Sequence, residues 1–174
     1  MMNTIYVSKE GLEFLNVRLK KAKEQLVAVR AEKNTAYTAT GDTWHDNPYF
    51  NSLEQDEKRK VGEVGELIEL IKNAKVFSFE KRNVLRVQLG SILHIYRYYK
   101  ISGEEEEFVW EVGGYGETDI SKQRVAYNAP AMEVLMGKCV GDTLEADSPK
   151  GPVEYEVLGL FPTWEEVPCN FRIS

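Results

Sequence analysis

The sequence predicts an α+β protein, in which an antiparallel coiled-coil helical hairpin precedes a small, mostly antiparallel sheet that carries one short helix. Apolar residues recur with a 3,4 spacing through residues 1–77 and with period 2 afterwards. A turn-forming segment at 41–49 interrupts the helical spacing and predicts the tip of the hairpin. We therefore expect a hairpin domain at 1–77, a sheet domain at 83–162 and a C-terminal tail at 163–174.

The composition is that of a soluble globular protein, which we expect in the cytoplasm. Of 174 residues, 43% are hydrophobic and 29% are charged, and no apolar run approaches the ~20 residues that span a bilayer. We therefore expect no membrane association, and no secretory signal is visible either. Cys139 and Cys169 lack the spacing of a zinc site or redox pair, so we expect reduced thiols.

The net charge of −6 lies entirely in the second half. Residues 1–77 hold 12 Lys and Arg and 12 Asp and Glu, whereas the remainder holds 10 and 16. A protein that coats duplex DNA normally has a strong basic excess. Any contact with nucleic acid is therefore expected to be local.

The first helix begins after Ser8, whose hydroxyl can cap it. The spacing continues to Thr40 and Gly41, where glycine can adopt the left-handed conformation that ends a helix. The expected seam consists of Leu12, Leu15, Leu19, Ala22, Leu26, Val29, Lys33 and Ala36.

The second helix has a start signal in Asn47, a good N-cap, and Pro48, which suits the first helical position. Because so few residues separate the helices, they are expected to pack antiparallel within one chain, as a monomer. The seam continues through Phe50, Leu53, Glu57, Lys60, Val64, Leu67, Ile71 and Ala74. Pairing around the tip places Ala22 near Val64, Leu19 near Leu67 and Leu15 near Ile71.

After a linker at 76–82, alternating apolar residues predict strands, and turn-forming residues separate them. Gly103 with Glu104 to Glu107 is interpreted as a solvated loop tip, as are 113–114 and 148–151. A short helix at 131–136 follows Pro130 and ends at Gly137. The expected strands are 84–88, 91–99, 108–113, 143–146 and 153–161.

Two groups of motifs resemble bacterial transcript-cleavage factors of the GreA/GreB family over nearly the whole chain. At the tip, Gly41-Asp42 followed by Asn47-Pro48-Tyr49 is similar to the family loop Gly-Asp-Leu-Ser-Glu-Asn-Ala-Glu-Tyr. The family's C-terminal signature is similar to Asn128-Ala129-Pro130, Leu135-Met136-Gly137-Lys138, Val140-Gly141-Asp142 and the run from Ser148 to Val157.

The resemblance implies an FKBP-like second domain that binds RNA polymerase. It also implies a hairpin that enters the polymerase's secondary channel and stimulates cleavage of the nascent RNA 3′ end in a backtracked complex. Such a factor is not itself an enzyme. Its tip acids, here Asp42 and Asp46, help to hold a catalytic Mg²⁺ that the polymerase shares, and tight binding of Mg²⁺ to the isolated protein is not expected.

The tip departs from the family loop at its second acid. Aligned without a gap, the family's glutamate falls on His45 and its asparagine on Asp46. His45 is a candidate proton donor or acceptor, although neutral imidazole is a poor Mg²⁺ ligand. Asp42 and Asp46 can alternatively be turn and capping residues, and a tip with altered chemistry can enter the channel and inhibit.

The resemblance also suggests contact residues. A basic set on the middle and outer hairpin, expected to contact RNA, consists of Lys23, Arg30, Lys33, Lys58, Arg59 and Lys60. The alternative for these residues is a solvated coiled-coil face with i,i+4 ion pairs. The residues expected to contact the polymerase are Trp44, Asn47, Tyr49, Asn128, Pro130, Gly137 and Lys138.

Three other functions compete with this interpretation. A stand-alone metallohydrolase would use Asp42, His45 and Asp46, but no HExxH motif supports it. A prolyl isomerase would use an aromatic pocket, and a pure interaction protein would use the hairpin as a spacer. The candidate pocket walls are Trp110, Tyr115, Tyr127 and Phe161.

Overall fold

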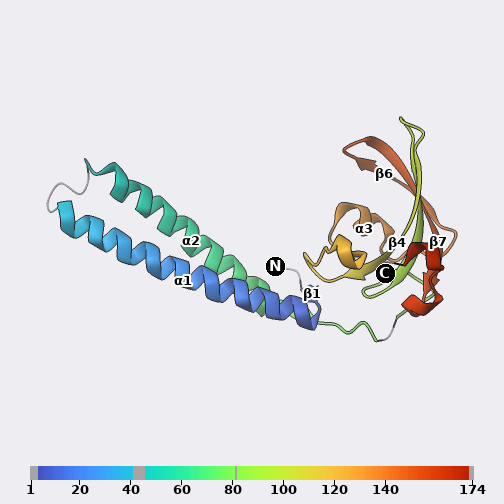
Figure 1. Ribbon diagram of the computed structural model, residues 1–174, viewed down its shortest axis with the longest axis horizontal. Coiled ribbons are helices and arrows are strands. Elements are labelled where there is room, and N and C mark those ends of the chain that lie inside the picture. Colours follow the sequence, from blue (N-terminus) through green and yellow to red (C-terminus); the bar gives the residue numbers. More distant parts are fainter. Residues whose placement is uncertain (1–3, 41–45, 81, 173–174) are drawn as a thin grey trace. The chain divides into compact units, whose positions relative to one another are not determined.

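The computed structural model describes residues 4–40, 46–80 and 82–172, which form two compact units (Figure 1). The first unit contains residues 12–74, and the second contains residues 5–11 together with 75–172. The helices are α1 (Lys9–Thr40), α2 (Pro48–Lys72), α3 (Pro130–Leu135) and the 3-10 turns η2 (Ile120–Lys122), η3 (Trp164–Glu166) and η4 (Cys169–Phe171). The strands are β1 (Ile5–Val7), β2 (Ala74–Val76), β3 (Ile92–Tyr99), β4 (Glu105–Gly113), β5 (Arg124–Ala126), β6 (Thr143–Ser148) and β7 (Gly151–Phe161).

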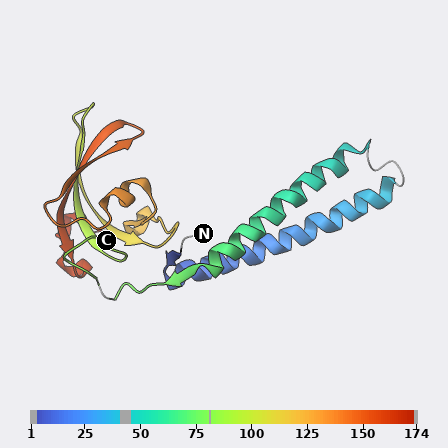
Figure 2. The ribbon, with the colours of Figure 1, turned by 180° about the vertical axis from the view of Figure 1, so that it is seen from behind.

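The first unit is the predicted helical hairpin. α1 begins after Ser8, a buried residue whose Oγ accepts a hydrogen bond from the Gly11 amide at 2.9 Å, so the predicted cap is confirmed. α1 and α2 lie side by side in both ribbon views (Figures 1 and 2). Contacts pair later residues of α2 with earlier residues of α1, as with Lys60 and Gln25, so the helices are antiparallel.

The predicted seam is confirmed from Leu12 to Ala36 and from Phe50 to Ile71, whereas its last position, Ala74, is wrong as a helical position because α2 ends at Lys72 and Ala74 begins β2. All sixteen residues from Leu12 to Ala36 and from Phe50 to Ala74 that the 3,4 spacing selects are buried or partly buried. Near the tip end, Ala36, Phe50 and Leu53 form one buried cluster against Val29. The apolar seam residues therefore pack α1 against α2 within the same chain.

The second unit contains a five-stranded sheet in the order β5-β4-β3-β7-β6. Its neighbouring strands are antiparallel except for β4 and β5, which are parallel. The pairing of β3 with β7 shifts by one residue between His94 and Ile95. The expectation of a mostly antiparallel sheet with one short helix, and the α+β class, are confirmed.

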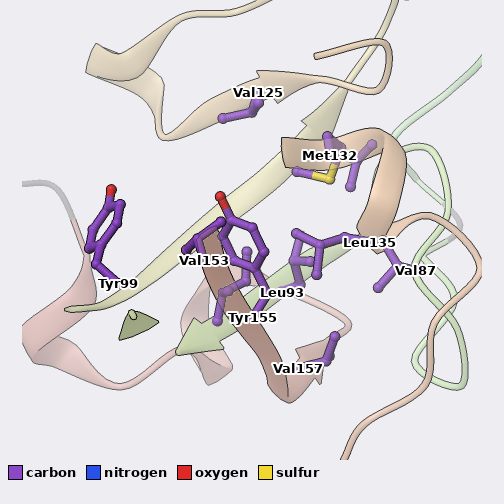
Figure 3. Close-up of a cluster of buried hydrophobic side chains, with 11 residues drawn as sticks. Val87, Leu93, Tyr99, Val125, Met132, Leu135, Val153, Tyr155 and Val157 are labelled. Atoms are coloured by element: carbon purple, nitrogen blue, oxygen red, sulfur yellow. The ribbon is translucent and has the colours of Figure 1, made fainter. Parts of the chain in front are cut away.

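The main core of this unit lies between one face of the sheet and α3. Leu93 and Val157 of the sheet, Met132 and Leu135 of α3, and Val87 are all fully buried there (Figure 3). The opposite face holds a smaller cluster of Ile92, Val109 and Val167, with Phe161, Trp164 and Phe171 packed against it. Residues 163–172, predicted as a tail, thus cover apolar side chains of the sheet.

The predicted strand at 84–88 is wrong, because local side chains hold this segment in turns. The Oδ1 atom of Asn83 accepts hydrogen bonds from the amides of Leu85 at 2.7 Å and Arg86 at 3.2 Å. Val87 is instead held by the chain beyond α3, since its amide donates to the Lys138 carbonyl at 2.8 Å. The apolar residue at position 87 is therefore explained by the burial of Val87 and does not indicate a strand.

The interpretation of Glu104 to Glu107 as a loop tip is wrong for its last three residues. Glu105, Glu106 and Glu107 are paired in β4, where Glu106 forms an ion pair with Arg97 of β3. Cross-strand charge pairing stabilises glutamates in an exposed strand. The sequence interpretation also missed β1, β2 and β5, each three residues long.

A buried carboxylate joins the linker to the sheet. Glu111 of β4 accepts hydrogen bonds from Arg82 at 2.6 Å and from Arg124 Nε at 2.8 Å, and its side chain is only 4% exposed. The Arg124 guanidinium also lies over the Phe79 ring at 4.4 Å. Since one carboxylate neutralises two nearly buried guanidinium groups, this site holds residues 79–82 against the sheet.

Candidate functional site

The described part of the hairpin tip is the capped start of α2. The Oδ1 atom of Asn47 accepts hydrogen bonds from the amides of Tyr49 at 3.0 Å and Phe50 at 3.4 Å, and Pro48 occupies the first turn. The predicted N-cap is confirmed. Because Asn47 performs the capping, the carboxylate of Asp46 is not needed for it, and Asp46 is exposed.

The remaining tip candidates, Asp42, Trp44 and His45, lie outside the described residues, as do Gly41 and Thr43. Their assigned roles stay predictions. The described residues therefore provide one carboxylate at the tip, that of Asp46, with oxygen donors of the kind that Mg²⁺ prefers. Nowhere in residues 4–40, 46–80 or 82–172 do three His, Cys, Asp or Glu side chains gather as a metal site.

In the first turn of α2, aromatic side chains contact residues of α1. The rings of Tyr37 and Phe50 lie 6.3 Å apart at a tilt of 48°. The Tyr49 hydroxyl donates a hydrogen bond to the carboxylate of Glu32, and this bond raises the pKa of Tyr49. Tyr49 is nevertheless 52% exposed, so its ring surface can still contact a partner.

Most of the basic set is paired with acids of the same hairpin. Lys58 lies 3.6 Å from Glu54, and Arg59 lies 2.8 Å from Asp56, both along α2. Lys23 is exposed and has no ion-pair partner within the part of the chain that the structure describes. These pairs agree with the alternative of a solvated coiled-coil face, while RNA contact stays a prediction.

Glu57 forms the most enclosed of these ion-pair sites. It occupies a seam position, and its two oxygens accept hydrogen bonds from Arg30 Nε, at 2.8 Å, and from Lys33 Nζ. The bond from Lys33, followed by that from Arg30, lowers the pKa of Glu57. Lys60, the next seam residue, contacts Gln25 at 2.7 Å and Glu63 at 2.9 Å. The middle of the hairpin thus has charged groups at two seam positions of α2, beside the buried Leu26 of α1.

The predicted contact residues of the second unit lie at the two ends of α3. Asn128 accepts a hydrogen bond from the Gly116 amide at 3.0 Å, and Pro130 is the exposed first residue of the helix. Gly137, with φ of +78°, ends the helix and donates to the Val87 carbonyl at 2.8 Å. Lys138 follows it. These residues have clear structural roles, and contact with a partner is untested for each.

The aromatic pocket of a prolyl isomerase is not assembled by the four residues proposed for it. Trp110 stacks on Phe108, with ring centroids 4.3 Å apart, and packs against the main core together with Tyr127. Phe161 packs in the smaller cluster on the other face of the sheet. Side chains on opposite faces cannot line one pocket, so the residues named for this rival function do not support it.

Comparisons with known proteins identify the family. The family described as "Transcription elongation factor, GreA/GreB, C-term" matches residues 86–160. A transcription elongation factor GreA of Methylobacterium sp. (strain 4-46) is 30% identical over 122 residues, which cover 70% of this chain and 74% of that protein. The chain belongs to the GreA/GreB family of transcription elongation factors. The GreA of Thermosipho melanesiensis is 26% identical over 156 residues, covering 90% of this chain and 96% of the relative.

The solved structures include that of the GreA factor homolog 1 (Gfh1) protein of Thermus thermophilus. It is 21% identical, with coverage of 91% of this chain and 99% of that one, at a TM-score of 0.41. No helix in the described residues of this GreA/GreB-family chain is both long and apolar enough to cross a membrane.

Sequence reasoning missed two pairings that help to build the hairpin. Glu32 and Tyr49 lie 17 residues apart, and only the antiparallel register brings them together. Glu57 and Lys33 occupy opposing seam positions, so opposite charges at facing positions of the 3,4 pattern could have predicted their contact.

Proposed function

We propose that this GreA/GreB-family protein binds RNA polymerase and inserts its hairpin tip through the secondary channel to stimulate cleavage of backtracked RNA. The observation that carries this function is an exposed acid, Asp46, directly before the capped start of a long helix. At ~1.5 Å per residue, the 25 residues of α2 extend about 38 Å. Family membership supports an elongation role, and the long arm supports a remote point of action.

In this function Asp42 and Asp46 add oxygen ligands for Mg²⁺ to those of the polymerase. The ion, when bound, supplies activation of water and stabilisation of the leaving oxygen in phosphodiester hydrolysis. Asn47 fixes the backbone beside Asp46 by capping α2. The pair of Glu32 and Tyr49 and the cluster around Phe50 hold the two helices together behind the tip. The hairpin thus positions acid, while the polymerase performs the cleavage.

Nascent RNA is proposed to meet the basic set on the same hairpin. Lys23 has an unpaired charge within the described residues, and Lys58 and Arg59 are exposed. The protein is proposed to act in the cytoplasm as a monomer, since its seam residues pair within one chain.

A transcript-cleavage assay on a stalled, backtracked polymerase tests this function. The wild-type protein should accelerate cleavage. Asp42→Ala or Asp46→Ala should reduce the acceleration by on the order of 10- to 100-fold, the range seen when a metal's ligand environment is weakened. Binding to polymerase should be unchanged. Glu54→Ala is the matched control, because it removes an exposed carboxylate two turns along α2 from the cap.

A second candidate function rests on the tip sequence. His45 stands where the family loop has glutamate, so the tip can occupy the channel with different chemistry. If the wild-type protein binds polymerase and slows synthesis without cleaving RNA, the cleavage function is wrong and channel inhibition is right. Unchanged cleavage by both aspartate variants would instead make the hairpin a spacer.

A further inference from the structure

A groove lies on the surface of the hairpin, beside the coiled-coil seam. It has a volume of about 560 Å³ and is lined from α1 and α2. Two of its apolar side chains, Phe14 and Val17, are 63% and 65% exposed, although they are large and lie on a helix. The other lining residues are Arg18, Lys21, Ala22, Gln25, Lys60 and Glu63.

The two exposed apolar residues of this groove, Phe14 and Val17, are not seam residues of the hairpin. The seam uses Leu15 and Ala22, which are buried, whereas Phe14 and Val17 project beside it. Covering these two side chains would remove apolar surface from water, which favours binding of a partner. Lining residues on α1 recur every three or four positions from Phe14 to Gln25, which spans about three helical turns, or ~16 Å. This length and spacing suit a helix as the occupant.

The charge of the groove determines which helix fits. Arg18 and Lys21 have no ion-pair partner among the described residues. Arg18 contributes to the lowered pKa of Glu63 by Coulomb attraction, without forming an ion pair with it. Lys60 and Glu63 are paired with each other at 2.9 Å, so their charges cancel. The groove therefore presents an apolar surface with two uncompensated positive charges.

We propose that this groove docks an acidic amphipathic helix of a partner protein. The apolar stripe of that helix covers Phe14 and Val17, and its carboxylates meet Arg18 and Lys21. Single-stranded RNA fits less well, because the groove offers one aromatic ring, that of Phe14, for base stacking and two uncompensated cations for the phosphate backbone. The docking site is separate from the tip and does not depend on transcript cleavage.

Fluorescence anisotropy with the full-length protein tests the groove. The probe is a labelled synthetic helix of roughly five turns, or about 18 residues, with leucines at 3,4 spacing and glutamates elsewhere. A second peptide carries lysine in place of each glutamate. The acidic peptide should bind at least about tenfold more tightly than the basic one, and salt should weaken its binding.

Variants locate the binding site. Phe14→Ala and the double variant Arg18→Glu/Lys21→Glu should each weaken the acidic peptide by about tenfold. All three residues lie outside the seam, so circular dichroism should show an unchanged helix content. Val27→Ala/Lys20→Glu is the matched control on α1 outside the groove, and its affinity should equal that of the wild type.

Each of the following results would overturn the proposal. They are absence of binding, equal affinity for both peptides, equal affinity of the wild type and Phe14→Ala, and Phe14-dependent binding of a single-stranded RNA oligonucleotide in place of the acidic peptide. Phe14-dependent self-association in sedimentation would likewise assign the groove to a second copy and reject a partner helix.

Discussion

Removing the Glu57 carboxylate should destabilise the hairpin at its polar middle. The side chain of Glu57 is 17% exposed, that of Lys33 is 28% exposed and that of Arg30 is 55% exposed. Solvent screens the Arg30 contact, for which we expect about 0.3–0.5 kcal/mol, as for exposed pairs. The Lys33 contact lies between exposed and buried pairs, so we expect roughly 1–2 kcal/mol. Glu57→Ala should therefore lower the free energy of unfolding of the hairpin by about 1.3–2.5 kcal/mol.

Urea unfolding followed by helical circular dichroism measures this loss, and its pH dependence gives a second test. Lys33 and Arg30 lower the pKa of folded Glu57 from its ordinary value of 4.5. A carboxylate with a lowered pKa contributes stability that is fully present above the unfolded pKa and is lost as the pH falls through the folded pKa. The difference between wild type and Glu57→Ala should thus be constant near neutral pH and shrink below pH 4.5.

Double-mutant cycles test whether the less exposed contact of Glu57, with Lys33, contributes more stability than the exposed contact with Arg30. Lys33→Ala and Glu57→Ala should show a coupling free energy of about 1 kcal/mol or more, and Arg30→Ala should couple with Glu57→Ala by less than about 0.5 kcal/mol. Glu54→Ala, which breaks only an exposed pair with Lys58, is the control. Equal coupling of Arg30 and Lys33, or none for Lys33, would refute the reasoning.

Three further substitutions test the stability of the two units. Gly62→Ala and Gly65→Ala should each stabilise the hairpin by about 1 kcal/mol, because both glycines are inside α2 and nothing lies within 4 Å of an added Cβ; destabilisation in urea unfolding would show that the helix interior needs glycine. Glu111→Ala should destabilise the second unit by about 3–5 kcal/mol, because it leaves two nearly buried guanidinium groups without their carboxylate. Thermal unfolding measures this, and Glu104→Ala, which removes an exposed pair with Lys150, should change stability by less than about 1 kcal/mol.

The sequence predicted the hairpin well because its determinants are local. The seam positions up to Ile71 follow from the helical period, and Asn47 with Pro48 marks the start of α2 through chemistry within one turn. The contact between Glu32 and Tyr49 depends on the register of two helices across an intervening tip. The apolar spacing within one helix does not determine how the two helices are aligned, so it cannot predict this contact by itself.

The sheet was predicted in part, and its failures have physical causes. Long strands such as β3 and β7 alternate clearly, but β1, β2 and β5 are too short to show a period. At 84–88 the side chain of Asn83 formed a turn that apolar alternation does not reveal. The burial of Glu111 also escaped prediction, because its two arginine partners come from distant segments.

The ion pairs of the hairpin impose an order on the predicted RNA contacts. A lysine that binds an RNA phosphate must break or weaken its ion pair with a carboxylate of the hairpin. Breaking the pair costs about 0–1 kcal/mol when it is exposed and more when it is enclosed. Lys23 has no such cost within the described residues, and Lys58 gives up only a 3.6 Å contact, whereas Lys33 must leave the enclosed Glu57. Cross-linking of RNA to lysine→alanine variants in the polymerase complex should therefore lose most signal at Lys23 and least at Lys33. The reverse order would mean that the polymerase rearranges the hairpin's charge pairs on binding.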